Sequence, residues 1–246
     1  MRREHYKLNC LALGWPMDIL TYGHWGQPLI VMPTSRGRHF EFEDFGMVGA
    51  IADLIDAGRV KVYCPDACDW DNWYAGDAHP GHRAHRYSKF MDFILRDVVP
   101  FVREHSRNDG IRPWLTGASW GAFHAANLAL REPELFPTAI CMSGAYDPAM
   151  FTGGYSDPNV HGTSPLRIVR FAGGEQRDRL ARAANLQLVC GRGKWQDRSL
   201  HDTVELHHAL EAKGIPHGFD IWGHDSEHDW PAWRYQIRHY LEHFTR

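Results

Sequence analysis

The sequence predicts an α/β fold with a mainly parallel central sheet, an antiparallel edge at the N-terminus and helices on both faces. From residue 29 onward, short apolar runs alternate with segments whose apolar residues recur at helical spacing. Before that point, residues 5–14 and 17–23 alternate polar and apolar side chains, which is typical of two antiparallel strands. A length of 246 residues, with 43% hydrophobic and 23% charged residues, fits one domain spanning 1–246.

Each later element has its own pattern. Short, mostly apolar runs predict strands at 28–32, 59–65, 113–117, 138–144, 185–191 and 217–223. Helical spacing predicts helices at 47–58, 86–105, 121–133, 199–214 and 229–244. Residues 146–184 break the alternation, because they are rich in Gly, Pro, Asp and Arg. We expect an irregular insertion there, lying over the carboxyl ends of the strands, where such sheets bind ligands.

Charge and hydropathy exclude several classes of partner. The net charge is −3 and no basic run occurs, which argues against a nucleic acid as the main partner. No segment is apolar for long enough to span a membrane, and Lys7 and Asn9 interrupt the N-terminal apolar residues where a secretory signal would need them. The odd count of five cysteines predicts buried, reduced thiols in a cytoplasmic protein.

Residues 117–121 read "GASWG", a serine between two glycines that match the pattern G-x-S-x-G. A strand-like run precedes the motif and a helical segment follows it, as a nucleophile elbow requires. The alternative is a chance serine in a glycine-rich turn, which this context disfavours. We therefore expect Ser119 to be a nucleophile, with the backbone N–H of Trp120 as one donor to an oxyanion.

A serine hydroxyl needs a base, and in such folds the chain order is Ser, acid, His. His228 and His224 both follow the last predicted strand, and His228 is preferred because it lies directly before the closing helix. A metal held by these two histidines is the less favoured interpretation. Asp197 is the preferred acid because it lies in a loop, although its type also suits a helix N-cap region. Asp202 and Glu205 are the alternatives, and they fall on the following helix.

The second oxyanion donor should come from the loop "PTSRG" after the strand 28–32, where Ser35 and Arg36 are the candidates. Trp73 follows another strand end and Trp195 neighbours the candidate acid, so both are candidate walls of a substrate pocket. Packing beneath a loop is an equal alternative for these two rings. Three histidines at 79, 82 and 85 could bind a metal, but the Pro80–Gly81 pair favours a solvated loop, and no metal site is predicted.

Five stretches together resemble the esterase D group of α/β-hydrolases, which includes S-formylglutathione hydrolases, feruloyl and acetyl-xylan esterases and mycolyltransferases. They are "VMPTSRG", "YCPDACDWDNWY", "LTGASWGAFHAANLALREPELF", "SGAYD" and "HDWPAWRYQIRHYL". The resemblance runs from about residue 20 to the end of the chain. It implies the α/β-hydrolase fold, a triad of Ser, Asp or Glu, and His, and no cofactor.

Carried onto this chain, the resemblance supports Ser119 and His228 firmly, and Asp197 less firmly because its loop aligns ambiguously. It also suggests the Ser35 N–H as the second oxyanion donor. The chain departs from the group in reading "PTS" where an HG pair is frequent, and in lacking a segment that ties it to glutathione thioesters.

The sequence thus predicts a serine ester hydrolase that acts on a small-molecule ester through an acyl-enzyme. An acyltransferase with the same triad is one rival, favoured by dry, Trp-rich walls. A binding protein that kept the fold without catalysis is the other rival, and the order of Ser, acid and His argues against it.

Overall fold

The computed structural model describes all 246 residues and contains one eight-stranded sheet, in the order β1-β2-β4-β3-β5-β6-β7-β8. The strands are β1 (Arg3–Cys10), β2 (Trp15–Tyr22), β3 (Gln27–Met32), β4 (Val60–Pro65), β5 (Trp114–Ala118), β6 (Ala139–Met142), β7 (Leu186–Cys190) and β8 (His217–Ile221). Strand β2 pairs antiparallel with β1 and with β4, and all other pairs are parallel. The predicted α/β fold with an antiparallel N-terminal edge is confirmed.

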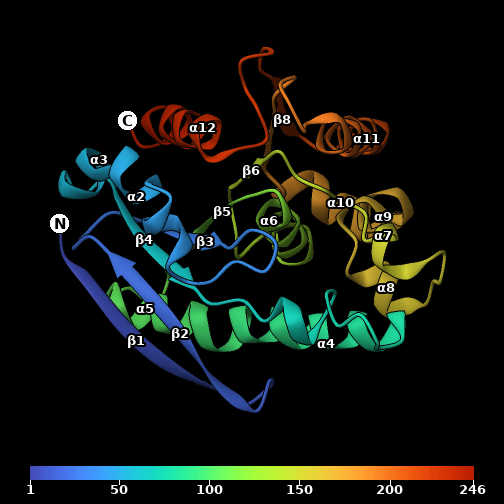
Figure 1. Cartoon of the computed structure of the whole chain (residues 1–246), viewed down its shortest axis with the longest axis horizontal. Coiled ribbons are helices and arrows are strands. Elements are labelled where there is room, and N and C mark those ends of the chain that lie inside the picture. Colours follow the sequence, from blue (N-terminus) through green and yellow to red (C-terminus); the bar gives the residue numbers. More distant parts are fainter.

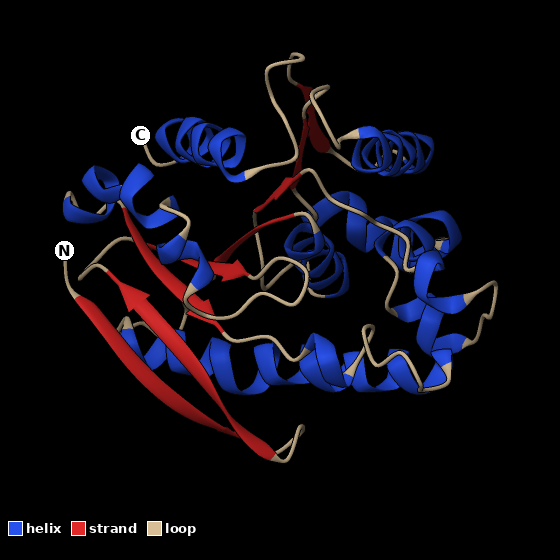
Figure 2. Cartoon of the chain, in the orientation of Figure 1, coloured by secondary structure: helices blue, strands red, loops and turns tan.

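Helices cover both faces of this sheet (Figures 1 and 2). They are α1 (Glu41–Asp44), α2 (Met47–Ala50), α3 (Ala52–Asp56), α4 (Pro80–Phe93), α5 (Val99–His105), α6 (Trp120–Arg131), α7 (Ala149–Thr152), α8 (Pro158–Gly162), α9 (Pro165–Phe171), α10 (Gly174–Ala183), α11 (Asp197–Lys213) and α12 (Trp230–Phe244). Helices α2, α3 and α12 pack on one face, whereas α4, α5, α6 and α11 pack on the other.

Two hydrophobic cores follow from the alternation of side chains along the central strands. In β3, Leu29 and Val31 enter the core beneath α12, whereas Ile30 and Met32 enter the larger core beneath α6. All four side chains are buried, because a parallel strand in the middle of the sheet has a helix layer on each side. The uninterrupted apolar run in the sequence therefore reflects burial on both faces.

The segment predicted as one helix at 86–105 begins earlier and is interrupted. Pro80 is the first residue of α4 and His79 caps it by accepting a hydrogen bond from the Gly81 N–H, so the expected solvated loop at 79–85 is wrong beyond His79. Proline is favoured at this position because its missing N–H would have had no helical acceptor. A π-helical turn, η2 (Ile94–Val98), joins α4 to α5 just before Pro100, whose ring excludes a regular α-helical hydrogen bond.

Two other segments differ in detail. The helix expected at 47–58 is split into α2 and α3, with Ile51 at φ −122° between them. The expected insertion at 146–184 contains four short helices, α7 to α10. Of these, α8 packs against α4, and α9 packs against α6 and α11.

All five cysteines are buried, as predicted. None of the helices combines the length and the apolar composition that crossing a bilayer needs.

Truncation of a buried and of an exposed leucine tests the assignment of the core. Leu188 of β7 is completely buried, so Leu188→Ala should lower the free energy of unfolding by about 2–5 kcal/mol. Leu11 is 94% exposed at the tip of the hairpin, and Leu11→Ala should change it by less than about 0.5 kcal/mol. Urea titrations of both variants measure the difference, and equal midpoints would contradict the assigned core.

Candidate active site

Ser119 lies at the turn between β5 and α6, with φ +54° and ψ −120°. A non-glycine residue adopts this backbone conformation only under strain, and it projects the side chain away from both flanking elements. A Cβ atom at position 117 would lie 2.3 Å from the carbonyl carbon of Gly121, and one at position 121 would lie 2.3 Å from the Met32 oxygen. Both glycines are therefore required by close backbone packing around the turn.

His228 approaches Ser119 from the loop between β8 and α12. Its Nε2 atom lies 3.0 Å from Ser119 Oγ, within hydrogen-bond distance. The backbone N–H of His228 donates to the backbone carbonyl of Lys194. The imidazole makes a T-shaped contact with the ring of Trp233. Burial lowers the pKa of His228 below its usual range, which keeps the imidazole neutral and able to accept a proton.

The alternative base, His224, is not part of this arrangement. It is exposed, and its Nδ1 atom lies 3.1 Å from the carbonyl oxygen of Arg192.

The other ring nitrogen of His228 faces two uncharged side chains. Nδ1 lies 3.3 Å from Gln196 Oε1 and 3.3 Å from Ser199 Oγ. Gln196 is 1% exposed and Ser199 is 6% exposed, so this pocket is closed to solvent. The sequence analysis considered only carboxylates for this place and therefore missed both residues.

The expectation that Asp197 supports the imidazole is wrong in this structure. Asp197 is the exposed first residue of α11, and neither a hydrogen bond nor an ion pair joins it to His228. Residues 196 and 199 share a helix face because they are three apart, whereas Asp197 is rotated from that face by about 100°. The alternatives are also engaged elsewhere, since Asp202 accepts from the Tyr146 N–H and Glu205 pairs with Arg170.

Backbone N–H groups without an acceptor lie near Ser119. The Trp120 N–H belongs to the first turn of α6, where N–H groups have no acceptor within the helix. In the loop after β3, the Thr34 N–H donates to Glu41 and the Arg36 N–H donates to Asp69 at 2.8 Å. The Ser35 N–H between them has no acceptor in the protein. This loop geometry favours Ser35 over Arg36 as an oxyanion donor.

The predicted pocket walls lie in different surroundings. Trp73 is completely buried between Tyr87 and Phe151, so the expectation that it lines an open pocket is wrong. Trp195 is 72% exposed beside Gln196 and stays a candidate. Tyr74, the neighbour of Trp73, instead reaches the loop after β3, where its hydroxyl donates to Ser35 Oγ at 2.8 Å.

A cavity of about 730 Å³ contains neither Ser119 nor His228. It lies at the amino ends of β3 and β4, where Gly26 and Lys61 are among its lining residues.

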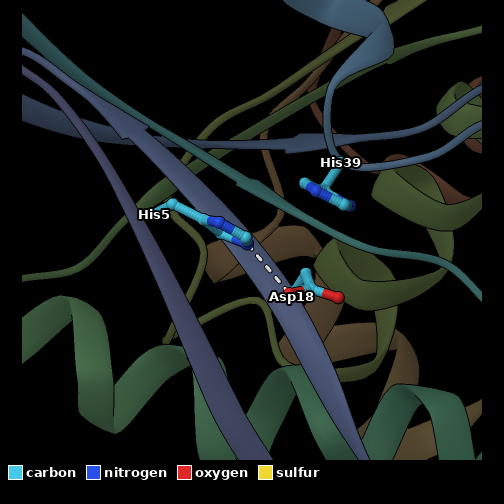
Figure 3. Close-up of side chains that lie close together, drawn as sticks. All are labelled: His5, Asp18 and His39. Carbon is cyan, nitrogen blue, oxygen red and sulfur yellow. Dashed lines mark hydrogen bonds and ion pairs between the residues drawn. The ribbon is translucent and has the colours of Figure 1, made fainter.

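A second cluster of polar side chains is the one place where the chain could hold a metal ion (Figure 3). His5 of β1, Asp18 of β2 and His39 of the loop after β3 offer ligand atoms that all lie within 4.8 Å of one another. Two imidazoles and a carboxylate suit zinc and similar ions. However, His5 already lies 2.8 Å from Asp18, and the Lys7 ammonium lies 3.8 Å from the same carboxylate. Both contacts lie within the N-terminal hairpin, whereas the His39 ring stacks on His5 and so links the hairpin to the loop that carries Ser35.

Glu41 accepts hydrogen bonds from the N–H and the hydroxyl of Thr34, and it thereby holds the loop after β3 that carries Ser35. Burial raises the pKa of Glu41 to about 7, and Asp69 and Asp66 contribute to the rise. Because the folded state binds this proton more tightly than the unfolded state, its contribution to stability is complete below pH 4.5 and is lost as the pH rises through about 7.

Relative to Glu41→Gln, the free energy of unfolding of the wild type should fall by up to about 3 kcal/mol between pH 4.5 and 8. Urea unfolding of both proteins across this range measures it, and a constant difference would refute it.

The sequence matches the family described as "Putative esterase" over residues 29–244. No curated protein sequence matches the chain. Among solved structures, a ferulic acid esterase is similar with a TM-score of 0.78 and 18% identity, covering 100% of this chain and 98% of that one. An S-formylglutathione hydrolase from Staphylococcus aureus gives 0.74 and 13%, covering 100% and 99%. Another from Agrobacterium tumefaciens gives 0.75 and 14%, covering 99% and 94%. These likenesses show that the chain shares the fold of those proteins, and the family match shows that it belongs to this esterase family.

Proposed function

We propose that the chain is a serine carboxylic ester hydrolase in which Ser119 is the nucleophile and His228 the general base. The observation that carries the proposal is the 3.0 Å contact between Ser119 Oγ and His228 Nε2. Ser119 makes this contact from a strained turn with a positive φ, which projects its hydroxyl out of the backbone. A surface serine next to a histidine would need neither the positive φ nor the two flanking glycines.

The chemistry would proceed in two half-reactions. His228 takes the proton of Ser119 as its oxygen attacks the ester carbonyl, and the oxyanion that forms accepts hydrogen bonds from the Trp120 and Ser35 N–H groups. The alcohol leaves with the proton held on His228 Nε2, and the acyl group stays on Ser119. A water molecule then gives a proton to His228 and attacks the acyl-enzyme, and His228 returns that proton to Ser119 Oγ as the acid leaves.

The proposed substrate is a small-molecule ester. The similar structures are titled as a ferulic acid esterase and an S-formylglutathione hydrolase, and an ester and a thioester of this kind are both small molecules. Tyr74 near Ser35, and the exposed Trp195 beside Gln196, offer aromatic surface on which a planar group could stack.

Removal of the nucleophile tests the proposal directly. Ser119→Ala should lower kcat/KM for p-nitrophenyl acetate by at least about a thousandfold and abolish labelling by a fluorophosphonate. Ser156→Ala removes an exposed hydroxyl elsewhere and should leave both unchanged. Equal turnover by wild type and Ser119→Ala would refute the assigned nucleophile. Wild type that is neither active nor labelled would favour a binding protein, and ester exchange with added alcohol in preference to hydrolysis would favour an acyltransferase.

The pH profile should report the buried imidazole. His228 must be neutral to accept a proton, and its pKa is lowered. The acid limb of the kcat/KM profile should therefore have its midpoint below pH 6.5, the usual pKa of histidine. A pH series of kcat/KM with p-nitrophenyl acetate measures this limb. A limb centred above pH 6.5 would contradict the arrangement, because it would require an anion beside the ring.

A further inference from the structure

The pocket on the Nδ1 side of His228 contains no carboxylate. Its polar atoms are Gln196 Oε1 and Ser199 Oγ, each 3.3 Å from Nδ1, and no aspartate or glutamate oxygen lies within 4.0 Å of the ring nitrogens. The closest acidic influence is Asp229, the next residue along, but its side chain is turned to cap α12 at the Trp230 N–H.

Other charged groups nearby are directed away from the ring. Asp197 and Arg198 are exposed on α11, and Lys194 pairs with Glu227 at the surface. The half-buried imidazole therefore has no counter-ion in contact with it.

Gln196 is held firmly in this pocket. Its Nε2 donates to Ser143 Oγ at 2.9 Å, and the same oxygen accepts from Trp233 Nε1 at 3.1 Å. The Cys190 thiol lies 3.3 Å from Gln196 Oε1 and can donate to it. With its NH2 engaged by Ser143, the amide presents its oxygen to His228.

The loop that carries Gln196 is also bound to the loop that carries His228. Arg192 and Gly193 donate their N–H groups to the carbonyls of Gly223 and Ser226, and His228 donates back to Lys194. A Cβ at position 191 would lie 1.9 Å from the Ser226 oxygen, so the two loops are in backbone contact. Gln196 and His228 thus keep a fixed mutual position.

We infer that Gln196 is the positioning residue for His228, taking the place of a triad acid, and that it slows acylation most for esters whose leaving group must be protonated as it departs. This inference rests on the proposed function. The amide oxygen accepts the Nδ1 proton and so leaves the Nε2 lone pair free for Ser119, as a carboxylate would. Unlike a carboxylate, it carries no charge to stabilise the imidazolium that forms when Ser119 attacks.

This selectivity follows from the tetrahedral intermediate. Without a buried anion, the intermediate that includes the imidazolium is high in free energy and reverts quickly by returning its proton to Ser119. A leaving group that departs as an anion, such as a phenolate or a thiolate, competes with this reversal, whereas an alkoxide must first take the proton from His228. Aryl esters and thioesters should therefore acylate Ser119 faster than alkyl esters do, whereas deacylation, in which Ser119 Oγ takes the proton from His228, is the same step for all of them.

The pocket is nevertheless equipped to accept a carboxylate. Three groups contact the Gln196 side chain and can donate to it, namely the Cys190 S–H, the Ser143 O–H and the His228 Nδ1–H. The Ser199 O–H lies 3.3 Å from the same Nδ1 atom. Glutamate has the same shape as glutamine, so Gln196→Glu changes the charge without changing the packing.

The experiment compares Gln196→Glu with wild type on aryl and alkyl acetates of increasing leaving-group pKa. The variant should raise kcat/KM for p-nitrophenyl acetate at least about tenfold and raise it more for ethyl acetate, because the new carboxylate stabilises the imidazolium that forms during acylation. The acid limb of the pH profile should move to higher pH, which a role in packing alone would not cause. Gln176→Glu adds the same charge at an exposed position of α10 and should change neither.

A folded Gln196→Glu protein that a fluorophosphonate still labels, with no gain in rate and no movement of the acid limb, would overturn the inference and leave the proposed function intact. Loss of activity in Asp197→Asn would overturn it too, since Asp197 would then be the acid. Gln196→Met serves if the glutamate variant fails to fold. It removes the acceptor at similar volume, and it should lower kcat at least about tenfold with KM little changed. Unchanged kcat would overturn the inference.

Discussion

The geometry of the site depends on direct backbone contact between the end of β3, the end of β5 and the start of α6, with no side chain between them. The turn at Ser119 brings Gly121 against the carbonyl oxygens of Met32 and Pro33, at the end of β3. The loop that carries Ser35 begins at the same point. One backbone contact therefore fixes the nucleophile, the amino end of α6 and the start of this loop relative to one another, and a single added methyl group would separate them.

Backbone strain is concentrated around this contact. Five non-glycine residues have a positive φ, and four of them, Arg36, Ser119, Ser143 and Trp195, lie in turns that contribute to the site or support it. Each would relax in an isolated peptide, so the sheet and its helices must hold them. Ser143 shows what the strain achieves, since its hydroxyl lies between Gln196 and Trp233 and connects the support of His228 to α12.

Much of this arrangement could be predicted from the sequence because it depends on local chemistry. The two glycines flanking Ser119 mark the turn, and His228 is marked by its place after the last strand and before the closing helix. The partner of His228 could not be found in this way, because it depends on the residue at which α11 begins. A start at Asp197 directs residues 196 and 199 inward, and a shift of one residue would have directed others there. Trp73 shows the same limit, since a ring after a strand end can face either the core or the opening of the site, and here the neighbouring Tyr74 takes the outer place.

The uncharged pocket beside His228 also has a genetic consequence. The codons for glutamine and glutamate differ only in their first base, and the donors around Gln196 would suit either side chain. A single base substitution is therefore enough to place a buried anion beside the imidazole, with no second change needed to repack the surroundings. If Gln196 acts as inferred above, this one substitution separates an esterase selective for good leaving groups from one that also cleaves alkyl esters efficiently.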